Sequence, residues 1–133
     1  MHIIIGGAYN GKRKYVTEQL KTQAVEWCND LQHSNIENEY AEILVITDLE
    51  KQIEPFLNEP EKEVAETFFN KIVKNGFKYK SIYVIIEDIG RGVVPIISEK
   101  RKLRDVLGRL YQLLFAESQT ITRIWYGIPQ KIK

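Results

Sequence analysis

The chain opens with the stretch Ile3-Ile4-Ile5-Gly6-Gly7-Ala8-Tyr9-Asn10-Gly11-Lys12-Arg13, in which an apolar run leads directly into a glycine-rich loop. The apolar run predicts a buried strand over residues 3–5, and helical apolar spacing follows the loop. A second apolar run, residues 82–86, leads into Glu87-Asp88-Ile89-Gly90-Arg91-Gly92. Two apolar strands that each end in a glycine loop favour an α/β fold with both loops at one edge of the sheet.

Apolar runs and helical stripes alternate along the chain, which predicts a three-layer α/β fold with a mostly parallel sheet in a single domain, residues 1–133. We expect strands over residues 3–5, 43–46, 82–86 and 121–126. We expect helices over residues 12–31 and 61–74 and from Ser98 onward, with Ser98 as the cap. The stripe of the first helix is Val16, Leu20, Ala24, Trp27 and Leu31. Residues 32–42 are expected to form a polar loop, the pattern over residues 48–60 is weak, and the chain is expected to end in a short basic tail.

The composition narrows the class of protein. The chain has 19 basic and 18 acidic residues and a net charge of +1, which argues against a broad nucleic-acid surface. The single cysteine, Cys28, cannot form an internal disulfide, and it fits a reducing cytoplasm. No apolar run approaches the roughly 20 residues needed to cross a bilayer, and the first residues lack a basic leader. We therefore expect a cytoplasmic protein without a membrane span.

The first loop fits the phosphate-binding pattern G-x-x-x-x-G-K-[ST] at every position except the last, which is Arg13. Its glycines, Gly6, Gly7 and Gly11, allow the backbone to curl so that N–H groups, including those of Ala8, Tyr9 and Asn10, face an anion. Lys12 supplies a positive charge to the outer phosphates. The loop therefore predicts binding of ATP or GTP, and the alternative is a strand-to-helix turn that binds nothing.

In the standard motif the final hydroxyl binds Mg²⁺, with an Asp near the end of another strand. Asp48 has that place, so we predict it as a metal ligand and, with Lys12, as a catalytic residue. The requirement for Mg²⁺ is left open, because Arg13 cannot coordinate a cation. Three roles are open to Arg13: it contacts phosphate and partly replaces the metal, it pairs with Asp48 or Glu87, or it points to solvent.

The second loop adds candidate nucleotide-binding residues at the end of the strand over residues 82–86. They are Glu87, Asp88, Gly90, Arg91 and Gly92. Because neighbouring side chains of a strand point to opposite faces, only one of Glu87 and Asp88 is expected to face the ligand. Arg91 is expected either to reach a phosphate or an acidic partner, or to be an exposed loop residue.

Several motifs together resemble one enzyme family. Ile4-Ile5-Gly6-Gly7-Ala8 with Asn10-Gly11-Lys12 is similar to the opening of the bifunctional adenosylcobinamide kinase / adenosylcobinamide-phosphate guanylyltransferases of cobalamin biosynthesis. Residues 88–95 resemble the family's N-E-V-G-x-G-I-V-P signature, and residues 104–112 resemble its R-D-x-L-G-x-x-N-Q helix. Residues 127–133 resemble its terminal G-I-P-x-K. The match covers approximately residues 1–20 and most of the chain after residue 82.

The resemblance implies a RecA-like P-loop fold that is often oligomeric, so it predicts a homo-oligomer. It also implies ATP or GTP as ligand and a corrinoid, cobinamide, as partner. This chain departs from the family at Arg13, where the family has a hydroxyl, and at Glu87-Asp88, where it has Asn-Glu. Asp48 is similar in position to the Asp of the family's D-C-L segment, although the cysteine is absent. No segment matches the one that carries the guanylylated histidine, and His33 lacks the surrounding pattern, so guanylyltransferase activity is expected to be lost.

Three functions remain as alternatives from the sequence. The first is a shortened, cobinamide kinase-like phosphotransferase that binds a nucleoside triphosphate. The second is a non-catalytic nucleotide- or corrinoid-binding relative with a regulatory role. The third is a structural relative that has lost the ligand and keeps the glycines for the geometry of the turn.

Overall fold

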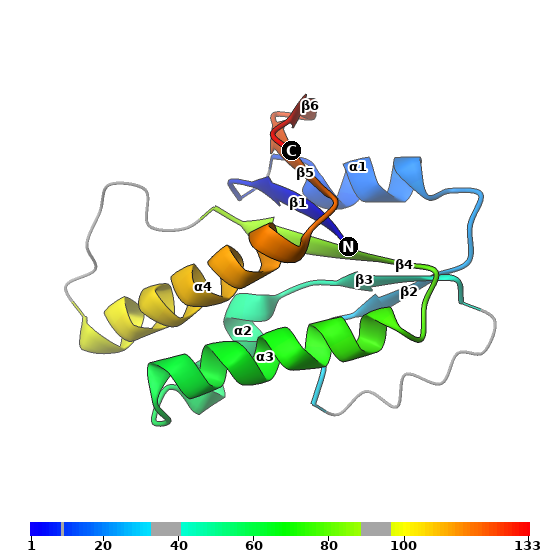
Figure 1. Ribbon diagram of the computed structural model, residues 1–133. Helices are drawn as coiled ribbons and strands as arrows, with labels where there is room; N and C mark the ends of the chain where they lie inside the picture. The colour runs from blue at the N-terminus through cyan, green and yellow to red at the C-terminus, as the bar shows by residue number, and fades with distance from the viewer. Residues whose placement is uncertain (9, 33–40, 89–96) are drawn as a thin grey trace.

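A mostly parallel sheet with helices on both faces forms the centre of the molecule (Figure 1). The structure is a computed structural model that describes residues 1–8, 10–32, 41–88 and 97–133. The strands within these ranges are β1 (His2–Gly6), β2 (Val25–Cys28), β3 (Ile43–Ile46), β4 (Ser81–Glu87), β5 (Thr120–Trp125) and β6 (Ile128–Lys131). The helices are α1 (Lys12–Gln19), α2 (Leu49–Ile53), α3 (Glu61–Gly76) and α4 (Ser98–Glu117), with a 3₁₀ turn η1 (Glu54–Phe56). The α/β class predicted from the sequence is confirmed.

The strands lie in the order β2-β3-β4-β1-β5-β6. Strands β1 to β5 are parallel to their neighbours, and β6 runs antiparallel to β5. The strands predicted over residues 3–5, 43–46 and 82–86 correspond to β1, β3 and β4. Parallel pairing brings the carboxyl ends of β1, β3 and β4 to the same edge of the sheet.

Two apolar clusters, one on each face, explain why the strands read as continuous apolar runs. On one face, Ile4, Val45 and Ile85 pack with Val16 and Leu20. The other face packs against α2, α3 and α4. Its largest fully buried side chains include Ile3, Leu44, Ile46, Ile53, Phe68, Ile72, Ile82, Ile86, Leu107, Leu110 and Leu114.

The two long helices lie side by side across one face of the sheet (Figure 1). The helix predicted over residues 61–74 is confirmed as α3, which continues to Gly76. The helix predicted from Ser98 is confirmed as α4, but its cap was predicted wrongly. Ile97 is the N-cap, with extended backbone geometry, and Ser98 is the first helical residue.

The prediction of one helix over residues 12–31 is wrong. Helix α1 ends at Gln19, and residues 25–28 form β2 at the edge of the sheet. The backbone of β2 pairs in parallel with β3, and the Thr47 N–H donates to the carbonyl of Cys28 at 2.9 Å. Because Ala24, Trp27 and Leu31 are spaced three and four residues apart, they mimic a helical stripe, but strand pairing overrides that local pattern.

The expected basic tail is also replaced by a strand. The strand predicted over residues 121–126 is observed as β5, and the chain then turns through Tyr126 (φ 46°) and Gly127 (φ 79°) into β6. Two central residues with positive φ are typical of a tight hairpin whose twist suits the flanking strands. Most of the loop expected over residues 32–42 lies outside the described residues, and the weakly patterned residues 48–60 contain α2 and η1.

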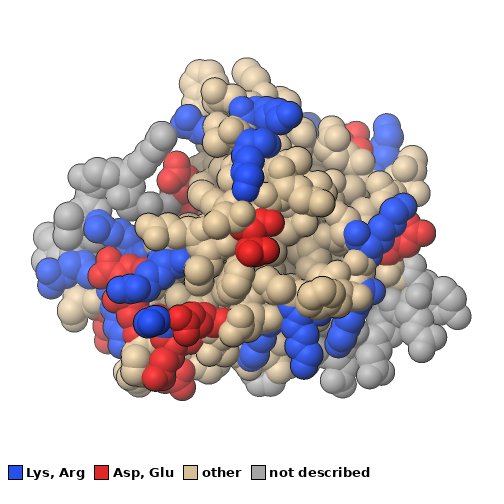
Figure 2. All heavy atoms as spheres, viewed as in Figure 1, with Lys and Arg blue, Asp and Glu red and all other residues tan. Residues whose placement is uncertain are grey.

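Basic and acidic side chains are interspersed on the face of the molecule seen in Figure 2. Among the described residues, no helix combines the length and the apolar character that a membrane crossing requires.

Candidate functional site

Strands β1 and β4 are neighbours in the sheet, but the helices that follow them in the chain pack on opposite faces. Such a change of direction opens a crevice at the carboxyl ends of parallel strands, where ligands bind in open α/β sheets. Gly6 and Glu87 are paired in register at this point, and the Asp88 N–H donates to the Gly6 carbonyl at 2.8 Å. The two predicted loops therefore begin side by side.

Helix α1 begins directly after the glycine loop. Gly11 is its N-cap and has φ 86°, a left-handed conformation that glycine adopts without strain. The first helical bond runs from the Tyr15 N–H to the Gly11 carbonyl at 2.9 Å. Helix geometry leaves the N–H groups of the first turn, which starts at Lys12, without an intrahelical acceptor. The Gly11 cap provides no side chain, and the first turn contains no acidic residue, so this helix end presents positive charge to the crevice.

The Lys12 side chain folds back across the loop. Its Nζ donates to the Gly7 carbonyl at 2.6 Å, and the Asn10 N–H donates to the same carbonyl at 3.3 Å. Burial lowers the pKa of Lys12 from its ordinary value, the nearby Glu87 carboxylate opposes that shift, and the positive charge of Arg13 adds to it. The ammonium group is thus held at the loop, in partly dehydrated surroundings.

Arg13 forms an ion pair with Asp48, which is one of the three roles left open by the sequence. Its Nη2 lies 3.0 Å from Asp48 Oδ2, and the Thr47 hydroxyl donates to the same oxygen at 3.1 Å. The side chains of Arg13 and Asp48 are 58% and 29% exposed, so the pair lies at the surface and contributes little to stability. Its importance is positional, because it links the loop after β1 to the end of β3 across the intervening β4.

A pocket of about 570 Å³ lies between the loop, the end of β3 and helix α4, a volume within the usual range for small-molecule sites. It is lined by Asn10, Gly11, Lys12, Arg13, Lys14, Thr47, Asp48, Leu49, Glu50, Lys51, Ile85, Glu87 and Tyr111. Four of these residues are basic and three are acidic. The pocket therefore brings together predicted residues that follow three different strands: Lys12 comes after β1, Asp48 comes after β3, and Glu87 ends β4.

Two pocket residues that sequence reasoning missed, Glu50 and Tyr111, have shifted pKa values. Burial raises the pKa of Glu50, and the carboxylates of Glu87 and Glu54 raise it further. Burial also raises the pKa of Tyr111, with smaller effects from nearby carboxylates. Glu50 is the second residue of α2, two residues after Asp48, and Tyr111 lies in the second half of α4. Only the packing of α4 against the sheet brings Tyr111 to this edge, so no local sequence signal identifies it.

A second hollow of about 620 Å³ lies on the other side of Tyr111, and its lining includes Asp88, Arg104 and Gln112. Glu87 lines the first pocket and Asp88 the second, so the two neighbouring carboxylates face different spaces. Four predicted site residues, Tyr9, Gly90, Arg91 and Gly92, lie outside the described residues.

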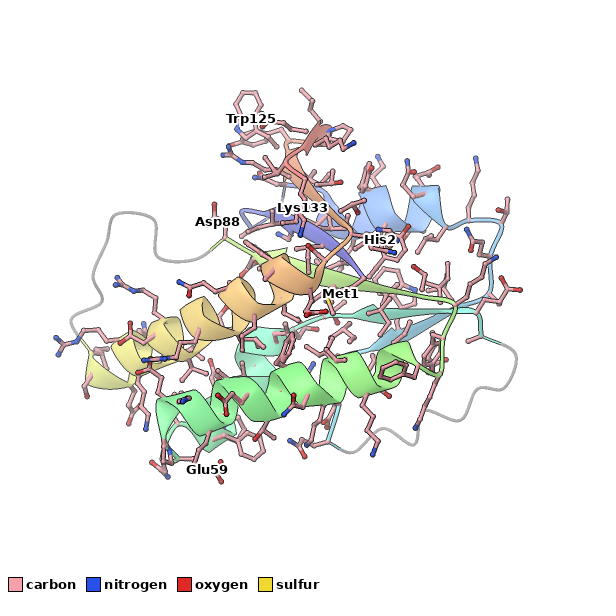
Figure 3. All side chains as sticks on the ribbon, in the orientation of Figure 1. Met1, His2, Glu59, Asp88, Trp125 and Lys133 are labelled. Atoms are coloured by element: carbon pink, nitrogen blue, oxygen red, sulfur yellow. The ribbon has the colours of Figure 1, made fainter. Side chains whose placement is uncertain are left out.

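The C-terminal hairpin supports the loop from the side opposite β4. The Gly127 N–H donates to the Asn10 carbonyl at 2.9 Å, so the hairpin turn is tied to the loop. Figure 3 labels Trp125 on this hairpin and Asp88 at the end of β4. Gly6 packs so closely on β5 that a Cβ atom there would lie 2.5 Å from the Ile124 carbonyl oxygen. The first glycine of the loop therefore allows close packing of β1 on β5, a reason that the sequence pattern did not reveal.

Comparison of the chain with protein-family models and with curated proteins gives no match.

Proposed function

We propose that this protein binds the phosphate chain of a nucleoside triphosphate, ATP or GTP, at the loop of residues 6–13, as a P-loop-like domain. The observation that carries the proposal is the placement of Lys12, whose ammonium group is held over a glycine loop at the N-terminus of α1. Backbone N–H groups at a helix start, together with a lysine, are the standard means of binding phosphate.

The surroundings of Lys12 support the same proposal. The pocket beside it has a volume suited to a small molecule and contains more basic than acidic residues. The Asp48 carboxylate lies at the end of a parallel strand two positions away in the sheet, where P-loop proteins hold the acidic residue of their phosphate site. The central position of β1, between β4 and β5, also suits a RecA-like arrangement.

The resemblance to the cobinamide kinases makes cobinamide the acceptor to test. In a kinase-like reaction Lys12 would stabilise the charge on the transferred phosphoryl group, and Asp48 would position Arg13 at the same pocket. We do not extend the proposal to guanylyl transfer, because no residue here matches the family's histidine segment. The Arg13–Asp48 pair favours a second candidate, a nucleotide-binding protein without catalytic activity, because it occupies the place of the hydroxyl–carboxylate pair that phosphoryl transfer uses.

Isothermal titration of the purified protein with ATP, GTP and inorganic tripolyphosphate tests the binding proposal. Lys12→Ala should weaken binding of all three by about tenfold to a hundredfold, the loss expected for a hydrogen bond between charged groups. Lys12→Met, which keeps the aliphatic stem, should lose about as much. The matched control is Lys21→Ala, which removes the same charge from an exposed position outside the pocket.

Equal affinity of wild type and Lys12→Ala would contradict the proposed site. Catalysis is tested separately by incubating the protein with ATP or GTP, Mg²⁺ and cobinamide and measuring cobinamide phosphate by mass spectrometry. Product above the level of the Lys12→Ala variant supports a kinase. Binding without product supports the non-catalytic alternative.

A further inference from the structure

The residues at the edge of this pocket do not fit the Mg²⁺ site that the P-loop motif implies. In that motif the residue after the loop lysine donates a hydroxyl oxygen to the metal, and a strand-end Asp assists. Here the residue after Lys12 is Arg13, which offers no oxygen, and the guanidinium is 3.0 Å from the Asp48 carboxylate.

The Asp48 carboxylate oxygen that faces the loop already has two donors. Oδ2 accepts from Arg13 Nη2 and from the Thr47 hydroxyl at 3.1 Å. Mg²⁺ requires near-octahedral oxygen ligands at about 2.0–2.1 Å, and a fixed positive charge at the carboxylate opposes a second cation. The arrangement therefore disfavours the metal and favours an acceptor of hydrogen bonds.

We propose that the Arg13 guanidinium, held by Asp48, takes the place of the divalent cation, so that the pocket binds the metal-free nucleoside triphosphate. This inference rests on the proposed function and adds to it the ionic form of the ligand. The substrate class is a free polyphosphate chain rather than its magnesium complex.

The chemistry of the guanidinium suits this role. It is positively charged and carries five N–H donors in a planar fork that matches phosphate oxygens. Pairing through Nη2 leaves donors for a second acceptor, and the pocket is lined by both partners of the pair. Asp48 then acts on Arg13 as it would act on a metal, fixing the position of the positive charge. The partial exposure of both side chains leaves the pair accessible to a ligand.

The charges that line the pocket also favour the metal-free triphosphate over its magnesium complex. The lining has four basic side chains, Lys12, Arg13, Lys14 and Lys51, against the three acidic side chains Asp48, Glu50 and Glu87, so basic groups are in excess without any metal. A magnesium complex of a triphosphate has lost part of the negative charge that the basic side chains attract. The free triphosphate should therefore bind at least as tightly as the complex.

The test is titration of ATP and tripolyphosphate into wild-type protein at matched ionic strength, once with excess Mg²⁺ and once with EDTA. Wild-type affinity in EDTA should equal or exceed the affinity in Mg²⁺. Arg13→Ser restores the hydroxyl of the motif, and it should weaken binding in EDTA by about tenfold, with recovery in Mg²⁺. Arg13→Lys keeps the positive charge but loses the planar fork of donors. Its affinity in EDTA should therefore lie between that of wild type and that of Arg13→Ser.

The matched control is Arg109→Ser. Arg109 Nε pairs with Glu61 Oε1 at 2.6 Å, and the two side chains are 57% and 33% exposed, nearly the same as in the Arg13–Asp48 pair. This variant loses an equivalent surface ion pair outside the first pocket, so its affinity in EDTA should match that of wild type. Melting temperatures show whether each variant is folded. The comparison of wild-type affinity in EDTA and in Mg²⁺ does not depend on the folding of any variant.

The outcomes separate this inference from the proposed function. Wild-type binding that is lost in EDTA and restored by Mg²⁺ overturns the inference and leaves the phosphate site intact. Arg13→Ser that binds in EDTA as tightly as wild type also overturns it. Absence of binding in both conditions contradicts the phosphate site itself, and the inference falls with it.

Discussion

Substitution of Gly6 by alanine tests whether the loop is shaped by contact with its neighbouring strand. A Cβ atom at Gly6 would lie 2.5 Å from the Ile124 carbonyl oxygen and 3.4 Å from Cγ of Lys12. The first distance is shorter than any that real Cβ atoms show, and the oxygen belongs to the backbone of β5, so the two parallel strands must move apart. Forcing an extra methyl group into a packed core costs about 1–3 kcal/mol.

The corresponding change in melting temperature follows from the size of the chain. For 133 residues the entropy of unfolding is about 0.28 kcal/mol/K, so 1 kcal/mol shifts the melting temperature by about 3.6 °C. Gly6→Ala should therefore melt about 4–11 °C below wild type.

Gly108→Ala is the matched control, because it adds the same methyl group with the opposite expected effect. Gly108 lies in the middle of α4, and a Cβ atom there has no neighbour within 4 Å. Alanine at this exposed position should stabilise the helix by about 0.5–1 kcal/mol and raise the melting temperature by about 2–4 °C. Thermal unfolding followed by circular dichroism measures both. A Gly6→Ala variant that melts at or above the wild-type temperature would refute the close-contact argument.

Two further predictions concern the hairpin and the loop lysine. Gly127→Ala forces a side chain into φ 79° and should lower the free energy of unfolding by about 1–2 kcal/mol and the melting temperature by about 4–7 °C. An unchanged melting temperature would contradict it. Because only protonated Lys12 attracts phosphate and its pKa is lowered, tripolyphosphate affinity should decline with rising pH before the ordinary value of 10.5 is reached. Titration of tripolyphosphate across alkaline pH measures this decline, and the Lys12→Met variant should lack it. A wild-type affinity that stays constant up to pH 10.5 would contradict a role for Lys12 in binding phosphate.

The central part of the fold could be predicted because its strands are covered on both faces. Strands β1, β3 and β4 each show an uninterrupted apolar run, and α3 and α4 each show a clear helical stripe. Strands β2 and β6 were missed because they lie at the two edges of the sheet. Every residue of β6 is exposed, so this strand is held by backbone pairing with β5. Such pairing leaves no apolar pattern in the sequence from which the strand could be predicted.

The site could be predicted only as far as the parallel-sheet rule reaches. That rule correctly brings the glycine loop, Asp48 and Glu87 to one edge. The rule does not decide which of the three roles Arg13 has, because pairing with Asp48 depends on whether the arginine side chain reaches across β4. The rule also does not predict that Tyr111 lines the pocket or that the Gly127 N–H donates to the Asn10 carbonyl. Both depend on how distant segments pack against the loop.

Three carbonyl groups of the described loop residues are held by bonds within the protein, and this bears on how the proposed site would bind phosphate without the metal-binding hydroxyl. The Gly6 carbonyl accepts from Asp88, the Gly7 carbonyl from Lys12 and the Asn10 carbonyl from the hairpin. Residues held in this way would lose little conformational freedom on binding, so more of the proposed interaction with phosphate would remain as affinity. Lys12 has three N–H donors and uses one on Gly7, and the Arg13 fork is likewise oriented by one bond to Asp48. In the proposed site both cations are thus positioned by protein acceptors and retain donors for the ligand, which is the task that Mg²⁺ performs where a hydroxyl follows the lysine.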